Sequence, residues 1–426
     1  MRISLKKYNQ ILLIISFLVL LLSKALAGTV YSRILSIGLI LILGLSVIAS
    51  LRIRIKHTIT NYLFLVYLLL FVSSLVKQFF LTDLSLPGLI NVFLFFLIVV
   101  FVQCIAIQRI RPSLWDMVKL LYYILFSYVF LNIFLFILGF EQDRYMGTNA
   151  LLGLLNINID RASFIFAPSL AYFAMICGVC GLISLILFFK NKKFQFLIGF
   201  VISVTALLLT DSRGPIFGLV IIFLFLFPLR RLWIKYQLAL FLFYIFSVTL
   251  FVSVMFFINM YIFDLESLSR GGDTSLLSKR DLIWNLFFEN YDPSFFNLVF
   301  GYGNVGQYIS GISSKYKFLF VNWSNPDHIS LHNNSLQMLI DIGVLGIISF
   351  NFVLYKVNKF CIDEYKKNKE TYLLIIPAII NYLLILGFSD IIANISNVGV
   401  YFILIFLIIG VISQSNHKQF SDFKFR

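Results

Sequence analysis

The chain has 426 residues, of which 60% are hydrophobic and only 12% charged, and its formal net charge is +15. Soluble domains carry about 25% charged residues, so this composition excludes a water-soluble enzyme. In a soluble protein the basic excess would point to nucleic acid, but basic residues also collect in the cytoplasmic loops of membrane proteins. The composition therefore predicts a membrane protein with no nucleic-acid partner.

Twelve apolar segments follow one another along the chain. They span residues 10–27, 30–50, 59–76, 86–107, 118–140, 164–189, 194–210, 215–229, 237–263, 335–355, 371–389 and 391–412. Segments in lipid must be helical, because only a helix satisfies its own backbone there, and roughly 20 residues cross a bilayer. We predict an all-α polytopic membrane protein with about twelve transmembrane helices. Nine helices fall in 1–263 and three, with a tail, in 332–426.

Basic residues mark the termini and every second loop. Of the 34 basic residues, 23 lie in these places, in clusters within 2–7, 52–56, 109–119, 190–193, 230–235, 356–369 and 418–426. Because such clusters stay in the cytoplasm, we predict cytoplasmic termini and an outward-facing loop at 264–331. The first segment resembles a signal peptide; we expect it to be retained, and its cleavage would leave the remaining topology unchanged.

Segments 194–210 and 215–229 are short for full spans and form either two spans or a re-entrant hairpin. They meet at Asp211-Ser212-Arg213-Gly214-Pro215. An arginine at bilayer depth is costly unless it is paired or faces a cavity. Two interpretations stay open: a capped turn whose Arg213 reaches the headgroups, or a guanidinium presented to a phosphate, which its fork geometry suits.

The outward loop contains a predicted short helix through about Asn290, opened by the capping box Ser278–Asp281. On it, Arg280, Trp284 and Phe287 share one face at spacings i, i+4 and i+7. One interpretation is an amphipathic helix on the membrane surface with an aromatic anchor. In the other, Arg280 is a second anion clamp and Trp284 is a platform for lipid or sugar.

Further along the loop, the sequence Gly301–Gly306 matches the GxGxxG dinucleotide fingerprint letter for letter. The preceding strand and following helix that give this motif its meaning are missing. We therefore predict a tight turn with a close backbone approach. Cys177 and Cys180 have the spacing of a redox or zinc pair, but inside an apolar segment they are expected to be core residues.

The loop ends with two of the chain's four histidines, His328 and His332, directly before the next apolar segment. Their i, i+4 spacing can bind zinc on a helix, but no third ligand follows, so neither a metal nor another cofactor is predicted. A histidine exchanges a proton near neutral pH. With Arg213 and Arg280 nearby it would stay neutral and could act as a base. The alternative is an interfacial histidine without a chemical role.

Taken in order, these motifs resemble the O-antigen polymerase/O-antigen ligase superfamily of bacterial envelope glycosyltransferases. The shared pattern covers residues 210–346, and outside it only the number of segments and the topology match. Its members are a Ser-Arg-Gly turn, an Arg-x-x-x-Trp helix, a Gly-x-Gly turn, a His-Asn-x-x-Leu-Gln motif and a Gly-x-x-Gly pair: Ser212, Arg213, Gly214, Arg280, Trp284, Gly301, Gly303, His332, Asn333, Leu336, Gln337, Gly343 and Gly346.

The resemblance implies a GT-C-type fold and transfer of a glycan from an undecaprenyl-diphosphate carrier at the outer face of the cytoplasmic membrane. It implies that Arg213 and Arg280 hold the donor diphosphate and that His332 deprotonates the acceptor hydroxyl. The further predicted substrate-binding residues are Trp284, Asn333 and His328. The implied partners are a lipid-linked donor and acceptor, the bilayer and a co-polymerase that regulates chain length.

Two guanidinium groups can replace a metal in stabilising the anionic leaving group, and attack behind the anomeric carbon predicts inversion. We favour a polymerase of O-antigen or capsular repeat units, because polymerases are the more diverse and numerous group. A ligase that transfers the glycan to lipid A-core shares the same motifs. A flippase or other transporter is less favoured, since transporters often contain internal repeats and this sequence shows none. A non-catalytic scaffold would leave the arginines and histidines unexplained.

Overall fold

The computed structural model describes residues 59–81, 114–141, 169–261, 280–320, 326–394 and 398–424, together with parts of 11–22, 37–41 and 149–167. Within these residues every regular element is a helix, and the one isolated bridge joins Glu141 to Phe164. The predicted all-α class is confirmed for this part of the chain. Most of the predicted segment 30–50, all of 86–107 and the capping residues 278 and 279 lie outside the described residues.

Four helices in the described part are long and apolar enough to cross a membrane. They are α3 (Ile59–Leu81), α5 (Leu114–Ile137), α7 (Leu170–Asn191) and α16 (Asn334–Asn368). The other apolar helices are α8 (Phe194–Leu209), α9 (Arg213–Leu226), α11 (Gln237–Tyr261), α17 (Ile375–Leu386) and α18 (Val398–Lys424). Short pieces are α6 (Ala150–Gly153), α10 (Arg230–Lys235) and η4 (Thr371–Leu374). This arrangement is that of a polytopic membrane protein.

Helix α7 is the most enclosed of the four candidate spanning helices. Nearly all its residues from Leu170 to Leu187 are buried, and it packs against α5, α8, α9 and α17. Cys177 and Cys180 are free and fully buried on this helix, as expected for core residues. Helix α7 therefore forms the centre against which the polar-tipped helices α8 and α9 are placed.

The short helices α8 and α9 pack mainly on α7 and α17 and only slightly on each other. With 16 and 14 residues they measure about 24 and 21 Å, less than the ~30 Å of a hydrocarbon core. Two thin spans and a re-entrant hairpin both remain compatible with these lengths. In either case the helices meet at a tip, Thr210–Ser212, from which Arg213 opens α9.

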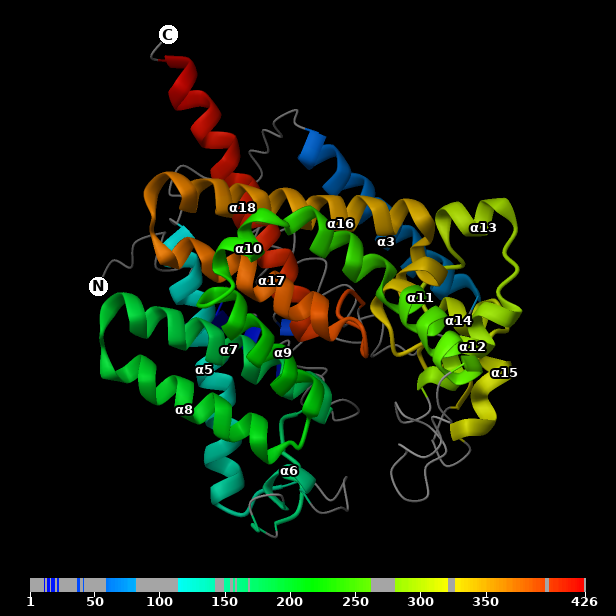
Figure 1. Ribbon diagram of the computed structural model, residues 1–426, viewed down its shortest axis with the longest axis horizontal. Helices are drawn as coiled ribbons and strands as arrows, with labels where there is room; N and C mark the ends of the chain where they lie inside the picture. Colours follow the sequence, from blue (N-terminus) through cyan, green and yellow to red (C-terminus); the bar gives the residue numbers. More distant parts are fainter. Residues whose placement is uncertain are drawn as a thin grey trace.

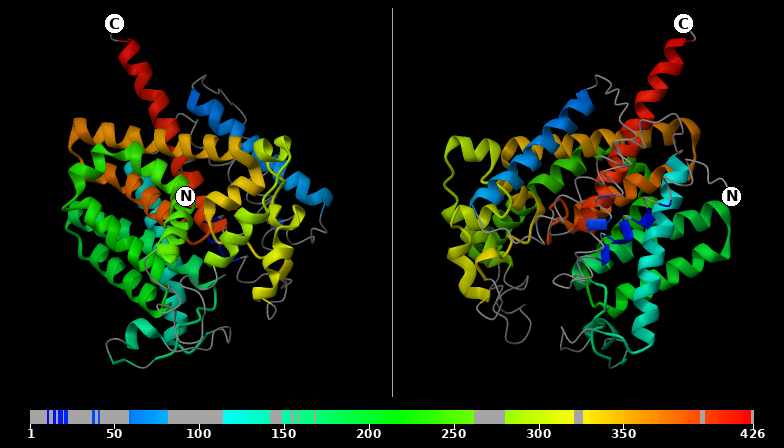
Figure 2. Two further views of the ribbon diagram at one scale, coloured as in Figure 1. Left: turned by 45° about the vertical axis from the view of Figure 1, so that its right-hand side comes forward. Right: turned by 180° about the vertical axis from the view of Figure 1, so that it is seen from behind.

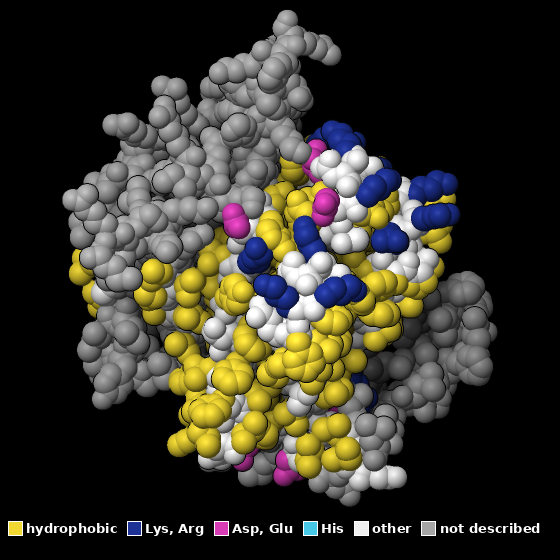
Figure 3. Space-filling model, turned by 90° about the vertical axis from the view of Figure 1, so that its left-hand side faces the viewer, with side chains coloured by type: hydrophobic (Ala, Val, Ile, Leu, Met, Phe, Trp, Pro, Cys, Tyr) yellow, Lys and Arg dark blue, Asp and Glu magenta, His cyan; other side chains and the backbone are white. Residues whose placement is uncertain are grey.

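Basic loops that alternate in the sequence meet at one end of the molecule. Lys190, at the end of α7, forms an ion pair with Glu370, which follows α16, with 3.2 Å between Nζ and Oε2. The Lys190 ammonium also lies over the ring of Trp115 at the start of α5. Lysine and arginine side chains gather on this face among apolar ones (Figure 3). The start of α5 and the loops after α7 and after α16 therefore lie together, as the basic pattern predicts.

The described part of the predicted outward loop, residues 280–320 and 326–331, forms a layer of short helices at the other side of the molecule, on the right in Figure 1 and on the left in the rear view of Figure 2. The helices are α12 (Arg280–Asn290), α13 (Phe295–Phe300), α14 (Gly306–Ile309), α15 (Ser313–Tyr316), η2 (Lys317–Phe320) and η3 (Pro326–His328). Helices α12 and α15 and the segment 329–331 share an apolar cluster with the first turns of α16, formed by Ile283, Trp284, Phe287, Ile312, Tyr316, Ile329, Leu331, Leu336 and Ile340. The loop is thus a folded layer with its own core.

Helix α16 is interrupted at Gly343, where φ is +71°. A side chain there would overlap the carbonyl of Val299 in α13. The turn after α13 lies on the same break, with Tyr302 N donating to Ile340 O (2.7 Å) and Gly303 N to Asp341 O (3.0 Å). The tight turn with a close backbone approach is therefore confirmed, and it joins the outward layer to the membrane helices.

Candidate active site

The three residues with predicted chemical roles begin or precede helices. Arg213 is the first residue of α9, Arg280 is the first residue of α12, and His332 lies two residues before α16. Arg213 is exposed and Arg280 is half-buried. Among the described residues neither guanidinium forms an ion pair. Both cations are therefore available to an anionic ligand.

A connection that the sequence did not single out, residues 387–394 between α17 and α18, brings these parts together. The Cβ position of Gly214, next to Arg213, is 3.6 Å from Oγ of Ser389. Asn334 N, in the first turn of α16, donates to Gly387 O (2.8 Å). The α9 tip and the start of α16 thus contact one short connection, which places Arg213 and His332 around it.

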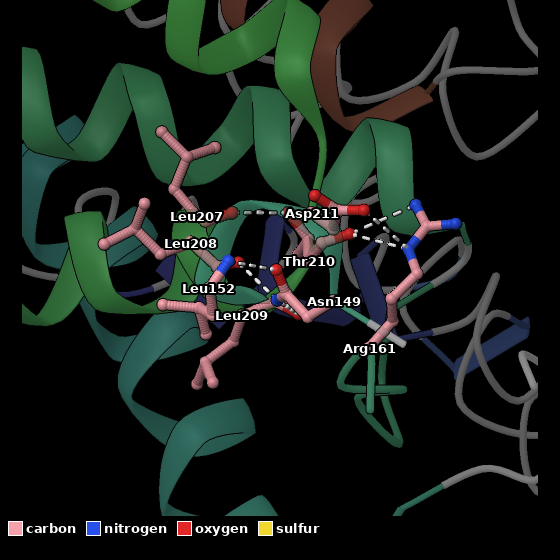
Figure 4. A network of polar contacts seen from close by, with 8 residues as sticks. All are labelled: Asn149, Leu152, Arg161, Leu207, Leu208, Leu209, Thr210 and Asp211. Carbon is pink, nitrogen blue, oxygen red and sulfur yellow. Dashed lines mark hydrogen bonds and ion pairs between the residues drawn. The ribbon is translucent and has the colours of Figure 1, made fainter. Parts of the chain in front are cut away.

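The tip that carries Arg213 is held by a segment from elsewhere in the chain (Figure 4). Arg161 donates hydrogen bonds from Nε and Nη2 to Thr210 O, at 3.3 and 3.2 Å. Its Nε is also 3.9 Å from Oδ2 of Asp211, a residue in the left-handed conformation with φ +51°. Asn149 Nδ2 donates to the carbonyls of Leu208 (2.9 Å) and Leu209 (3.3 Å).

His332 is half-buried and has a φ of +49°, an uncommon conformation for a residue other than glycine. Burial, and secondly the nearby Arg280 guanidinium, lower the pKa of its imidazole from 6.5 to about 3. The imidazole is therefore neutral at neutral pH, the form that a base requires. Its Nδ1 is buried and has no hydrogen-bond partner among the described residues, a costly state that a bound polar group would relieve.

The same arginine acts on a buried carboxyl group, Asp390, whose side chain belongs to a residue only 8% exposed. Burial raises the pKa of Asp390, and the Arg280 charge opposes this by lowering it. One carboxylate oxygen also accepts from Ile391 N (3.1 Å). The sequence analysis missed Asp390, although an acidic residue between two apolar segments is a signal of function in a membrane protein.

Trp284 does not lie where either of its predicted roles requires. The residue is 0% exposed, its Nε1 donates to Leu331 O (2.9 Å), and its ring meets that of Phe388 edge-on at 5.3 Å. The ring is therefore neither a membrane anchor nor an open platform for lipid or sugar. Instead it fixes the backbone next to His332 against the 387–394 connection.

The side chain of Asn333, predicted to bind substrate, forms hydrogen bonds within the protein instead. It is 1% exposed and is the N-cap of α16, where its Oδ1 accepts from Leu336 N (2.9 Å). Its Nδ2 donates to Phe388 O (2.8 Å). Asparagine at an N-cap satisfies a helix amide that would otherwise lack a partner. Asn333 thus holds its neighbour His332 at the start of α16.

His328 does not share a helix face with His332. The 3-10 helix η3 ends at His328, and the chain from Ile329 to Asn333 is not helical. The His328 ring stacks on Tyr308 with 4.5 Å between centroids. The expectation that the two histidines lie one helical turn apart is therefore wrong. No group of three or more metal-binding side chains occurs in the part of the chain that the structure describes.

A buried polar network supports the site from behind. The carboxylate of Asp341 accepts from Gly306 N (2.9 Å), Gln337 Nε2 (2.9 Å) and Asn394 Nδ2 (2.8 Å). The Gln337 side chain in turn accepts from Leu331 N (3.1 Å). Connected networks of this kind fix a single arrangement of the groups around them. The glycine turn, the His332 segment and the 387–394 connection are consequently held together.

Residues 198–350 match the model of the O-antigen ligase family. This segment belongs to the O-antigen polymerase/ligase superfamily. The resemblance drawn from the motifs in 210–346 is thereby confirmed. No curated protein matches the chain.

The O-antigen ligase segment runs from α8 into α16 and contains all six predicted site residues. Two further residues of the site, Arg161 and Asp390, lie outside it. The fold brings Arg161 to the α8–α9 tip and Asp390 to Arg280. The candidate site is therefore completed by parts of the chain on both sides of the matched segment.

Proposed function

We propose that the protein polymerises undecaprenyl-diphosphate-linked oligosaccharide repeat units into O-antigen or capsular polysaccharide at the outer face of the cytoplasmic membrane. The observation that supports this most strongly is that Arg280, which forms no ion pair among the described residues, lies near His332, whose imidazole is neutral at neutral pH. This pair lies within a segment of the O-antigen ligase family. It offers an anion site next to a base.

In this proposal Arg213 and Arg280 bind the diphosphate of the donor. A guanidinium presents paired N–H donors that match two phosphate oxygens. As the bond from the anomeric carbon to the diphosphate breaks, the leaving group departs with its electron pair as an anion and needs no proton. Preorganised cations that stabilise this developing charge contribute a large share of such rate enhancements.

His332 takes the proton of the acceptor hydroxyl as the hydroxyl oxygen forms its bond to the anomeric carbon. Attack from the face opposite the diphosphate inverts the configuration at that carbon. With a pKa of about 3 the imidazole of the free protein is a weak base. The negative charge of a bound diphosphate offsets the positive charge of Arg280 and so raises the pKa of His332. Donor binding thereby strengthens the base when it is needed.

A ligase that transfers the glycan to lipid A-core is the second candidate, because the matched family carries the description O-antigen ligase. The diphosphate site and the base would serve both reactions. The two differ in the acceptor, which is another lipid-linked chain for a polymerase and a core sugar for a ligase.

Reconstitution of the purified protein with a lipid-linked repeat unit alone distinguishes these functions. A ladder of products without lipid A-core is the expected result, whereas transfer only after lipid A-core is added identifies a ligase. Movement of the lipid without bond formation would contradict glycosyl transfer altogether. The reaction is expected to continue in excess chelator; a loss that Mg²⁺ or Zn²⁺ restores would show that two arginines do not suffice for the leaving group.

A further inference from the structure

The last turn of α8 is capped by a segment that lies far from it in the sequence. The final carbonyl groups of a helix have no partners within the helix. Here those of Leu208 and Leu209 accept from Asn149 Nδ2, Leu209 O also accepts from Ala162 N (3.0 Å), and Thr210 O accepts from Arg161. Three successive carbonyls are thus bound by residues 149–162 (Figure 4).

Arg161 contributes both hydrogen bonds and charge to this cap. Its guanidinium donates twice to Thr210 O and lies 3.9 Å from the Asp211 carboxylate. A cation at a helix C-terminus is favourable because of the helix dipole. Asp211 holds a left-handed φ of +51°, which is strained for a residue other than glycine. Arg161 therefore fastens the one strained residue of the tip.

The next helix does not supply a cap of its own to the tip. Ser212 is the N-cap residue of α9, but its side chain makes no capping hydrogen bond. Arg213 follows directly. The direction in which its guanidinium leaves the tip depends on the backbone just before it, where Asn149 binds the carbonyls of residues 208 and 209 and Arg161 binds that of Thr210.

We propose that Arg161 is a positioning residue that, together with Asn149, fixes Arg213 for donor binding. We call Arg161 and Asn149 the latch. This inference rests on the proposed function of Arg213. Arg161 acts here through the backbone of the tip and not through its own contact with the donor. Its effect on the donor should therefore disappear when Arg213 is absent.

A double-mutant cycle on the purified full-length protein tests the latch, with undecaprenyl diphosphate as the probe. Arg161→Gln is expected to weaken binding on the order of tenfold, a typical coupling for groups in one network. Arg161→Lys keeps a donor for Thr210 O and should weaken binding less. In an Arg213→Gln background, Arg161→Gln should add no more than about twofold.

Lys190→Gln is the matched control, because Lys190 is also a cation in an ion pair, but at the opposite end of the molecule. It should leave binding unchanged. Multiplicative losses from Arg161→Gln and Arg213→Gln would overturn the latch, as would unchanged binding by folded Arg161→Gln and Arg161→Lys proteins. If Arg213→Gln itself binds the probe normally, the donor site is wrong and not only the latch.

A different observation concerns α13, which lies in the loop that the sequence places in water. The helix Phe295–Phe300 has no buried residue, and Phe295 is 83% exposed. Phe296 and Phe300 are exposed as well. An exposed apolar cluster of this kind in a folded layer marks a contact with a partner.

The α13 surface continues the apolar surfaces of two candidate spanning helices. Val299 contacts the break at Gly343 in α16, and the residues that follow this break, Val344 and Ile348, are exposed. On α3, the Lys77 ammonium lies 5.4 Å from the centre of the Phe296 ring. Lys77 is the last residue but one of the apolar stretch Asn61–Gln78. Helix α13 thus sits level with the predicted outer end of that stretch.

We infer that α13 is immersed in the acyl chains of the outer leaflet and anchors the active-site layer to the membrane. The transfer of phenylalanine side chains from water to acyl chains is favourable in free energy. The Lys77 ammonium donates to Gly301 O at 2.8 Å and keeps its charge at the polar boundary, as long basic side chains do near helix ends. The outward loop is therefore partly a membrane-bound structure.

Nitroxide labels on single introduced cysteines in lipid nanodiscs test the immersion of α13. Leu69→Cys, on the exposed face of α3, calibrates a lipid position, and Lys315→Cys, on exposed α15, calibrates water. The label at Phe295→Cys should be relaxed by oxygen, like that at 69. Relaxation by a water-soluble nickel complex to the extent seen at 315, or protection from both reagents, would overturn the inference.

Discussion

The charge of Arg280 lowers the pKa of two neighbouring groups, a histidine and a carboxyl group, with opposite effects on their charged forms. It disfavours the imidazolium of His332 and favours the carboxylate of Asp390. Removal of the Arg280 charge should therefore raise the pKa of both groups. Substitution of His332 or Asp390 instead leaves the anion-binding guanidinium in place. The arrangement allows the donor site and the base to be tested separately.

Arg213→Lys and Arg280→Lys should each lose most of the polymer synthesis and bind undecaprenyl diphosphate more weakly. Lysine keeps the charge but is a compact point charge without the paired donors of a guanidinium. Binding and synthesis are measured on equally expressed, purified proteins. Full activity of both variants would show that charge alone is needed and that a fork-shaped contact to the diphosphate is not made.

Arg280→Gln should raise the pKa of His332 above its value of about 3 in the unaltered protein. It should stay below the ordinary 6.5, because burial is the larger of the two causes. The chain has four histidines, so a pH titration by NMR of histidine-labelled protein can follow His332, whose signals are identified by their absence in His332→Gln. An unchanged pKa would mean that Arg280 lies too far from the imidazole to affect its protonation.

At the scale of the elements, the break in α16 connects the outward layer to the membrane helices. Gly343→Ala places a methyl group at a φ of +71° and against the carbonyl of Val299. The strained φ costs roughly 1–2 kcal/mol and the overlap about 1–3 kcal/mol more. We expect a clearly lower midpoint of thermal unfolding in detergent.

Gly311→Ala is the control for this substitution, since Gly311 has a φ of +77° in open space. It bears only the cost of the strained φ and should lower the midpoint less. Equal shifts for the two variants would contradict the close approach of α13 to α16.

Patterns local in the sequence predicted the helix at 280–290, the tight turn at 301–306 and the burial of the cysteines on α7. They did not predict that Trp284 is buried against protein, because helical spacing shows which residues share a face but not whether that face meets lipid or protein. The two histidines were placed on one helix by spacing alone, but the left-handed backbone at His332 interrupts it.

Asp390 and Arg161 were missed for a related physical reason. Their partners, Arg280 and the α8–α9 tip, are distant in the sequence and are brought near only by tertiary packing. No periodicity or short motif records such a contact. An isolated charge next to apolar segments is the one signal that the sequence offered.

In the molecule as a whole, the loops after α7 and after α16 lie on the left of Figure 1, and the layer of helices α12–α15 lies on the right. We therefore predict that a reporter fused after Lys317 is extracytoplasmic and one fused after Lys367 is cytoplasmic. Alkaline phosphatase activity, with an enzyme active only in the cytoplasm as the converse reporter, measures both. A cytoplasmic signal after Lys317 would place the site on the wrong side for an outer-leaflet donor.

In the proposed mechanism the arginines and His332 form one site for glycosyl transfer from a lipid diphosphate. Polymer synthesis from a purified lipid-linked repeat unit, compared between the unaltered protein and His332→Ala in excess chelator, tests it most directly. The unaltered protein should form a ladder. The variant should be slower by on the order of 10²–10⁴, the usual effect of losing a general base, while it binds undecaprenyl diphosphate almost normally. A folded His332→Ala protein that forms the ladder at nearly the unaltered rate would contradict the claim.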